Sequence, residues 1–477
     1  MKQLISRAAP RSASLVAIAL AAAFSAAALP AHAAGEAKNI IFFLGDGMGP
    51  VTKTAARIYQ YKEDGSLTMD TLPYTARIKT YSLDGQTTDS APSMAAYMTG
   101  VKTRNEVLGM DGDTLAQPYA PTTLSGVGSA QNNCPATGNG AASTTLLELA
   151  IAKGKATGAV TTARLTHATP GATYAHVCHR NAEYEIARQA VPAGAGFNAK
   201  LGTGVDVMMG GISYYWRPYN AATTPKGRPD GRDLVAEMQA KGYAFASDLT
   251  TFNAVPTTAG TKVLALFDQA LSQGHMSYEA DRDPAKEPSL AQMTVKAIDI
   301  LSKNANGYVL MVEGGRIDHA LHGTNAYRAL TDTIAFDDAI KAALGKVDLT
   351  NTLIVVTADH DHTMAFNGYG KRGTPILGLN VSYATGANSL DADGLPYTTL
   401  VFGNGSNRPD MRVALDGTAV QGKEYLQEVA IRRGSPGSET HGGGDVQLYA
   451  TGAAAKTFKG TIDNTRVFTL LKSAGGL

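Results

Sequence analysis

Residues 39–49 read NIIFFLGDGMG, an almost continuous run of β-branched and aromatic side chains that ends in an aspartate between two glycines. Such a run lacks the alternation of a half-exposed strand and is typical of a strand that is covered on both faces. Asp46 follows the run directly. The stretch therefore predicts a buried strand of a parallel sheet with a carboxylate at its carboxyl end.

The same kind of run recurs along the chain, with helical patterns between the runs. Further strands are predicted at 159–162, 308–312 and 353–356, and helices at 144–153, 231–241, 289–302 and 326–344. Strands that alternate with helices predict an α/β fold with a large, mostly parallel central sheet. Two stretches rich in Gly, Asn, Thr and Pro, 110–140 and 366–438, are predicted to be insertions.

The N-terminal residues have the pattern of an export signal. Three basic residues precede an apolar run, and Ala31-His32-Ala33 is a small-x-small cleavage pattern. We therefore expect residues 1–33 to be a signal peptide and 34–477 to be the mature domain of a periplasmic or secreted protein. A membrane anchor is the weaker interpretation, because the apolar run is short and has no stop-transfer flank.

The expected mature chain is nearly neutral and has two cysteines. Without residues 1–33 it contains 39 Lys and Arg against 41 Asp and Glu, which gives no reason to expect a nucleic-acid or membrane-surface partner. Cys134 and Cys178 could form one disulfide in an oxidising compartment. A free buried thiol at Cys178 is the alternative, and the sequence leaves both open.

Acidic residues follow three of the predicted strands. Asp46 follows the first, Glu313 follows 308–312, and Asp359-His360 follow 353–356. Open α/β sheets bind ligands at the carboxyl ends of their strands. One aspartate after a strand is usually a turn residue or a helix cap, but three carboxylates at one edge, one of them beside a histidine, favour a binding site.

Two further motifs supply metal-ligand types. Asp318 and His322 are four residues apart, so on a helix they share one face and can coordinate one metal ion. His441 lies in the glycine-rich stretch SETHGGGD. Imidazole together with carboxylate favours zinc, and oxygen-rich sites favour magnesium. The combined set predicts both kinds of ion.

The candidate nucleophile is Ser90 in TTDSAPSMAAYMTG. The small and apolar residues from 91 to 99 predict a helix with Pro92 in its first turn. Asp89 and Ser90 would then lie at the helix N-terminus, where the dipole and free N–H groups favour negative charge. The same pattern is also ordinary helix capping, and the local sequence does not separate the two interpretations.

Six motifs in order resemble those of the alkaline phosphatases: NIIFFLGDGMG, TTDSAPSMAAYMTG, TTARLTHATPGATYAH with HRN, VEGGRIDHALH, TADHDH and ETHGGGD. They cover residues 39–445, and His167 makes the pattern closer to the animal-type enzymes than to the enteric type. The resemblance implies a three-layer α/β/α fold. It also implies hydrolysis of small phosphate monoesters of broad range through a phosphoserine, with two zinc ions and one magnesium ion.

The resemblance also implies a role for each matched residue. The first zinc would be held by Asp318, His322 and His441, and the second by Asp359, His360 and Ser90. Asp46 would bridge the second zinc to the magnesium, whose other protein ligands would be Thr169 and Glu313. Arg180 would clamp the substrate phosphate, and His167 and His319 would orient the ligands from outside. His176, His179 and His362 match no ligand position and are interpreted as structural or solvent-facing.

The chain departs from the animal-type pattern in two places and matches it in a third. Phe267, Asp268 and Glu287 lie near the segment of the additional calcium site, but extra residues follow Asp268, so the calcium site is left in doubt. Cys134 matches a family cysteine, whereas Cys178 does not match the usual partner. The insertion 366–438 resembles the crown insertion of the family, which implies a homodimer.

Three rival functions are weighed against this one. Ser90-Ala91-Pro92-Ser93 approaches a sulfatase signature, but Met94 stands where that signature needs arginine. Diesterase relatives tend to use threonine and to lack the arginine clamp. A non-catalytic phosphate- or metal-binding protein on the same fold is the third reading, and no element of the site is missing to favour it.

Overall fold

The computed structural model describes residues 36–117, 134–135, 137–267, 274–434 and 437–477. The predicted signal peptide and its cleavage site lie outside the described residues. None of the helices within the described ranges is both long and apolar enough to cross a membrane.

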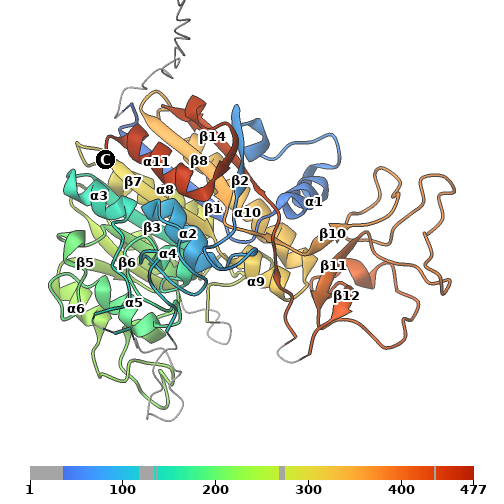
Figure 1. Cartoon of the computed structure of the whole chain (residues 1–477), viewed down its shortest axis with the longest axis horizontal. Helices are drawn as coiled ribbons and strands as arrows, with labels where there is room; N and C mark the ends of the chain where they lie inside the picture. The colour runs from blue at the N-terminus through green and yellow to red at the C-terminus, as the bar shows by residue number, and fades with distance from the viewer. Residues whose placement is uncertain (1–35, 118–133, 136, 268–273, 435–436) are drawn as a thin grey trace, which may run out of the picture.

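A ten-stranded sheet forms the centre of the molecule (Figure 1). Its spatial order is β15 (Gly460–Asp463), β2 (Tyr74–Lys79), β14 (Val446–Gly452), β8 (Thr352–Ala358), β1 (Asn39–Gly45), β7 (Tyr308–Gly314), β3 (Ala156–Arg164), β4 (Val207–Gly211), β6 (Lys262–Phe267) and β5 (Tyr243–Ala246). Only β14 runs antiparallel to its neighbours. The mostly parallel sheet is confirmed, and the four strands expected from the sequence are its four central neighbours.

Helices cover both faces of this sheet. As a result, β7 and β8 are buried at every residue. One group that packs together is α1 (Pro50–Tyr61), α8 (Leu290–Leu301), α9 (Arg316–His322) and α10 (Ala326–Leu344). The other is α2 (Ser90–Thr99), α3 (Leu146–Ala152), α4 (Ala168–Gly171) and α11 (Asn464–Gly475). Both groups contact the central strands, which gives the expected three-layer α/β/α arrangement. Shorter helices α5 (Glu183–Gln189) and α6 (Leu234–Ala240) lie towards the β5 end in Figure 1, and α7 (Leu249–Ala254) contacts β5.

A small separate sheet is formed mainly by the segment predicted to be an insertion, residues 366–438, on the right in Figure 1. It consists of β10 (Met364–Phe366), β11 (Leu400–Gly405) and β12 (Val429–Arg432). At the base of the insertion, β9 (Asp361–His362) pairs antiparallel with β13 (His441–Gly442), and His441 lies opposite His362. This pairing joins the two ends of the insertion and brings His441 to the edge of the main sheet.

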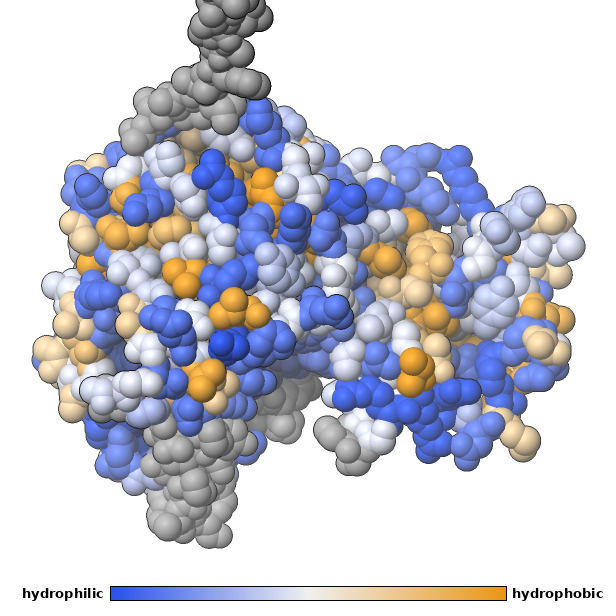
Figure 2. Space-filling view, viewed as in Figure 1, coloured by the Kyte–Doolittle hydropathy of each residue, from blue (hydrophilic) through white to orange (hydrophobic). Residues whose placement is uncertain are grey.

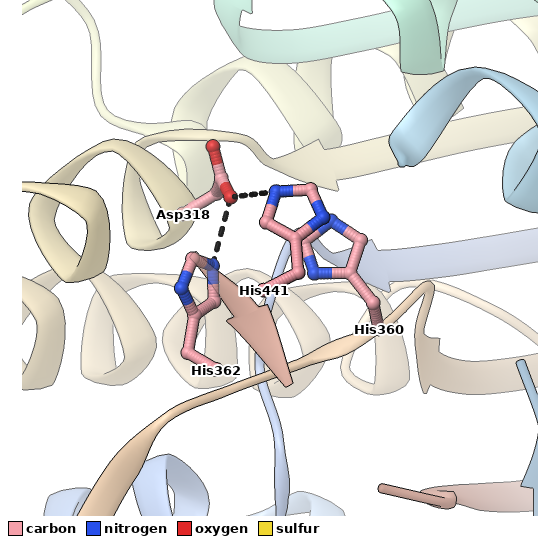
Figure 3. Close-up of side chains that lie close together, drawn as sticks. All are labelled: Asp318, His360, His362 and His441. Carbon is pink, nitrogen blue, oxygen red and sulfur yellow. Dashed lines mark hydrogen bonds and ion pairs between the residues drawn. The ribbon is translucent and has the colours of Figure 1, made fainter. Parts of the chain in front are cut away.

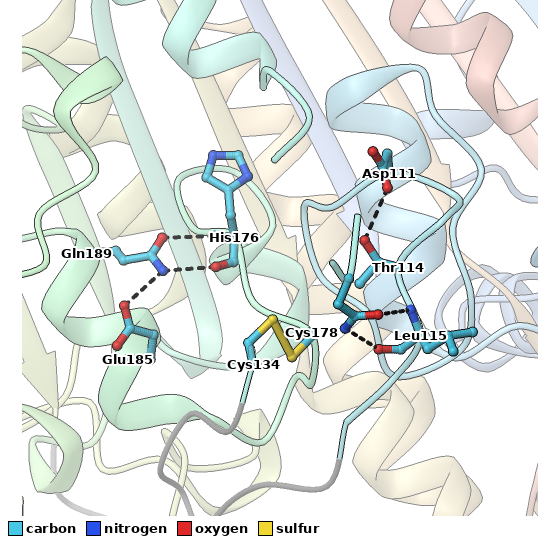
Figure 4. The surroundings of a disulfide bond; sticks show 9 residues. Asp111, Thr114, Leu115, Cys134, His176, Cys178, Glu185 and Gln189 are labelled. Carbon is cyan, nitrogen blue, oxygen red and sulfur yellow. Dashed lines mark hydrogen bonds between the residues drawn. A yellow bond between two sulfur atoms is a disulfide. The ribbon is translucent and has the colours of Figure 1, made fainter. Parts of the chain in front are cut away.

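Cys134 and Cys178 form a disulfide with a Cα–Cα distance of 5.5 Å (Figure 4). The bond joins the end of the first predicted insertion to the segment that precedes Arg180. Beside it, Gln189 bonds to the backbone of His176 and to the Glu185 carboxylate. Of the two cysteine states that the sequence left open, the structure therefore has the bonded one.

Candidate metal centre and active site

Three carboxylates lie at the carboxyl edge of the sheet, as expected. Asp46 follows β1 and Asp359 follows β8, while Glu313 is the penultimate residue of β7, because that strand continues two residues beyond the predicted end. All three side chains are fully buried. Because β8, β1 and β7 are parallel neighbours, their ends place these acids side by side.

Ser90 begins α2, and the neighbouring Asp89 caps that helix. The Asp89 carboxylate accepts the N–H of Ala91 at 2.7 Å, which satisfies one of the free donors of the first turn. The Ser90 hydroxyl is therefore not used as the cap. Its Oγ lies 3.2 Å from His360 Nε2 and 3.4 Å from Asp46 Oδ1, so it points into the carboxylate cluster.

A second cluster forms around Asp318 on α9 (Figure 3). Asp318 Oδ1 lies 3.3 Å from His322 Nε2 and 3.4 Å from His441 Nε2, and the two imidazole nitrogens are 3.1 Å apart. Asp318 and His322 share a helix face, as their spacing predicted. His441 joins them through the pairing of β13 with β9.

Three of the histidines are held in one tautomer. The Nδ1 atoms of His322, His360 and His441 each bond to a backbone oxygen, which can only accept. The acceptors are the carbonyls of Glu439, Asp361 and Thr88, at 2.6, 3.2 and 2.8 Å respectively. Each ring therefore carries its proton on Nδ1 and presents a bare Nε2 to the cluster, which is the form that binds a metal.

His362 has a different environment from these three rings. Its Nε2 donates to Asp318 Oδ1 at 2.8 Å and its Nδ1 donates to the Glu439 carboxylate at 2.6 Å. Burial alone would lower the pKa of His362, but the two carboxylate partners outweigh burial and raise that pKa to about 10. Both ring nitrogens are taken up by carboxylate partners, and the ring is buried rather than solvent-facing. Its interpretation as structural stays a prediction.

The predicted magnesium ligands surround a third position. Asp46, Glu313 and His167 offer ligand atoms within 4.8 Å of one another, and Thr169 lies buried beside Glu313. Burial raises the pKa of Glu313 to about 8 and that of Asp359 to about 7, and it holds the pKa of Asp46 well above its usual value. Within the described residues, Asp46 Oδ2 and Asp359 Oδ2 are buried without a hydrogen-bond partner. Bare carboxylates of this kind fit bound cations.

The Arg180 guanidinium is held from two sides, one of them by Asp89, which precedes Ser90 in the chain. Its Nη1 donates to Asp89 Oδ1 at 3.0 Å, and its Nη2 lies 2.9 Å from His167 Nε2. The backbone also fixes this position, because Arg180 N–H donates to the carbonyl of Glu106 at 2.7 Å. The guanidinium is thus held next to Asp89 at the start of α2, and its planar fork is able to bind two oxygens of a phosphate group.

Sequence reasoning overlooked two residues next to this site. The His275 ring lies 4.0 Å from the His319 ring and 5.8 Å from the His167 ring, measured between centroids. Glu439 contacts both His322 and His362. His275 belongs to no local pattern that indicates a site. Glu439 lies in the ETHGGGD motif, but that motif was used only for His441. Both residues lie in irregular segments and meet their partners only through the fold.

The remaining expectations fall outside the cluster. His176 is paired with the buried Glu148 at 2.7 Å, and His179 is half-buried 3.7 Å from Glu106. For the calcium segment, Asp268 lies outside the described residues. Glu287 accepts the backbone N–H of Ser277, and it belongs to none of the metal-ligand clusters found in the described part of the chain.

Taken together, a serine at a helix N-terminus, a half-buried arginine and paired carboxylate–histidine clusters at the edge of a parallel sheet define a metal-binding hydrolase. The alkaline phosphatase family model matches residues 37–477. The chain therefore belongs to the alkaline phosphatase family and is a phosphoric monoester hydrolase.

Individual relatives agree with this assignment. The alkaline phosphatase of Gadus morhua is 36% identical over 455 residues, which is 89% of each chain. The tissue-nonspecific isozyme of Gallus gallus is 35% identical over 89% of this chain and 82% of its own length. Among solved structures, the alkaline phosphatase of Thermus thermophilus has a TM-score of 0.65 at 25% identity, covering 93% of this chain and 92% of its own.

Proposed function

We propose that Ser90 is the nucleophile of this hydrolase and forms a phosphoserine during cleavage of small phosphate monoesters. The observation that carries the proposal is the position of the Ser90 hydroxyl. Asp89 takes over the capping of α2, and Ser90 Oγ points at Asp46 and His360. A hydroxyl at a helix N-terminus is well placed to become an anion, and a nucleophile in a metal cluster fits covalent phosphoryl transfer.

The donor set supports two zinc ions and one magnesium ion. Asp318, His322 and His441 would hold the first zinc, and Asp359, His360 and Ser90 the second, since both groups mix imidazole with oxygen donors. Magnesium would take the oxygen donors Asp46, Thr169 and Glu313, with Asp46 shared with the second zinc. When bound, such ions stabilise negative charge on the attacking and leaving oxygens.

Each of these side chains then has a separate role in the reaction. Arg180 holds two non-bridging phosphate oxygens and orients the phosphorus towards Ser90. Formation of the bond from Ser90 Oγ to phosphorus breaks the ester bond and releases the alcohol, and water then releases phosphate and restores Ser90. His167 orients Arg180, and His319 lies next to His167 with 5.3 Å between ring centroids. Because these contacts reach only the phosphoryl group, the substrate range should be broad.

We further infer that the chain is exported to the periplasm or the medium and forms a homodimer through the crown-like insertion. The insertion exposes large apolar side chains, with Tyr369 and Met411 each 84% exposed and Ile431 65% exposed. Figure 2 shows hydrophobic patches over this part of the surface. Light scattering on the purified mature protein should give twice the chain mass, and Ile431→Glu should shift it towards the monomer. A monomeric wild type would overturn this inference.

The first test compares an aryl phosphate monoester with its diester and sulfate analogues near pH 9. Strong monoester cleavage that a chelator abolishes and zinc plus magnesium restore is the expected result. A preference for the diester or the sulfate would contradict the role given to Arg180. Acid quench with a labelled monoester should trap phosphate on Ser90, and trapping on another residue would refute the nucleophile.

A further inference from the structure

Glu439 is a fully buried carboxylate two residues before His441, and it has no place in the proposed reaction. Its side chain accepts three hydrogen bonds. They come from His362 Nδ1 at 2.6 Å, from the backbone N–H of Thr363 at 2.6 Å and from the Thr363 hydroxyl. A buried anion with this many donors is firmly held, so the His362 ring that it contacts is held as well.

The backbone of Glu439 fixes a second ring. Its carbonyl accepts the Nδ1–H of His322 at 2.6 Å, and its N–H donates to the carbonyl of His322 at 3.0 Å. The side chain acts in parallel through His362, whose Nε2 donates to Asp318 Oδ1 at 2.8 Å. One residue thus contacts His322 directly and reaches Asp318 through a single intermediary.

We propose that Glu439 is a positioning residue that sets the zinc affinity of the site formed by Asp318, His322 and His441. This inference rests on the zinc assignment made above. Ligands that outer partners hold in their binding orientation lose little freedom when the ion binds, and loss of such a partner typically weakens metal affinity about 10- to 100-fold. Without the Glu439 carboxylate, His362 loses one of its two hydrogen-bond partners. The His362 ring is then less firmly oriented, and so is the Asp318 carboxylate to which it donates.

The test measures zinc affinity by chelator competition on the purified full chain, for wild type, Glu439→Gln, His362→Gln and the double variant. Glu439→Gln should weaken binding of one zinc equivalent about 10- to 100-fold and leave the other unchanged. If Glu439 acts through His362, the double variant should be no weaker than His362→Gln alone, because the two effects share one path.

The matched control is Glu148→Gln. Glu148 is also buried and also accepts from a histidine, with 2.7 Å to His176 Nε2, but its other hydrogen bonds go to Asn198 and Thr145, which are not candidate ligands. It should lower thermal stability without changing zinc affinity. If Glu439→Gln does not fold, Thr363→Val removes one donor to the same carboxylate and should weaken the same zinc equivalent by a smaller factor.

Three results would overturn the proposal. The first is wild-type zinc affinity in a folded Glu439→Gln or Thr363→Val variant, and the second is an equal loss in Glu148→Gln. The third is fully additive effects in the double variant. A wild type that binds no zinc at all would instead show that the zinc assignment itself fails, and the inference would fall with it.

Discussion

Removal of the metals with a chelator should destabilise this protein, and the loss should grow with pH. The reason lies in the carboxylates at the sheet edge. Asp359 and Glu313 are fully buried, and burial raises their pKa values to about 7 and about 8. Without cations, ionisation of these groups inside the protein is unfavourable.

The sign and the size follow from linkage. A carboxyl whose pKa is raised in the folded state contributes its stability below the unfolded pKa, near 4, and loses it as pH rises through the folded pKa. A shift of 3 to 4 pKa units corresponds to roughly 4 to 5 kcal/mol for each group at about 1.4 kcal/mol per unit. These are upper bounds, because water can enter an emptied site. Between pH 5 and pH 9 the loss runs from pH 5 to about 7 for Asp359 and to about 8 for Glu313, which is about 5 pKa units or roughly 7 kcal/mol for the two groups together. For about 440 residues, 1 kcal/mol changes Tm by about 1 °C, so the metal-free protein should lose up to about 7 °C over this range.

Thermal unfolding of the metal-loaded and the chelator-treated protein at pH 5 and pH 9 measures this effect. The Tm gap between the two forms should widen at pH 9, and zinc plus magnesium should close it. Metal-free Glu313→Gln is the control, since its amide does not titrate and its Tm should fall less with pH. A gap of equal size at both pH values would refute the reasoning, as would a Glu313→Gln variant with the wild-type pH dependence.

Further predictions concern single residues. Ser90→Ala should keep the fold and bind metal but lose most turnover, measured with an aryl phosphate; full activity would rule out the covalent route. Arg180→Ala should weaken inhibition by phosphate and lower kcat/KM for the monoester more than for the diester, and equal losses would show that Arg180 does not discriminate between them. Asp332, buried on α10, has its pKa raised to about 8 by burial, so the wild type loses stability between about pH 4 and pH 8. Asp332→Asn should remove that loss and raise Tm at pH 9 relative to wild type, and an unchanged or lower Tm there would contradict the burial argument.

The centre of the fold was accessible from the sequence, and its edges were not. β8, β1, β7 and β3 are covered on both faces, so their continuous apolar runs carry a strong signal. β2 (YTARIK) exposes four of its six residues and β5 has only four residues, so neither has such a run. Helix 231–241 was predicted three residues too early at its start, because Asp233 caps α6 by accepting the N–H of Ala236 at 3.0 Å.

The contacts of the candidate site also fall into those that the sequence could predict and those that it could not. Contacts within one helix turn or at one strand end follow from local spacing, which is why Asp318 with His322, and Asp46 with Asp359, could be grouped. Contacts that depend on tertiary structure could not be read from spacing. His441 reaches the cluster only because β13 pairs with β9 across the insertion, and its place was inferred from family resemblance. His275 lacked both kinds of signal, and Glu439, although it lies in the ETHGGGD motif, was given no role by either.

The edge of the sheet follows the ordinary rule for helix capping but breaks the ordinary rule that acidic side chains stay out of the core. The helix N-terminus at α2 is capped in the ordinary way, by Asp89, and this leaves Ser90 free to face the cluster. In contrast, Asp46, Asp359 and Glu313 are buried acids that an ordinary core would exclude. A sequence retains such groups when something bound compensates them, and the bare Nε2 atoms of the three backbone-anchored histidines face the same space. The groups that make the metal-free edge unfavourable are therefore the groups that create the binding site, so metal affinity, stability at alkaline pH and catalysis should be lost together.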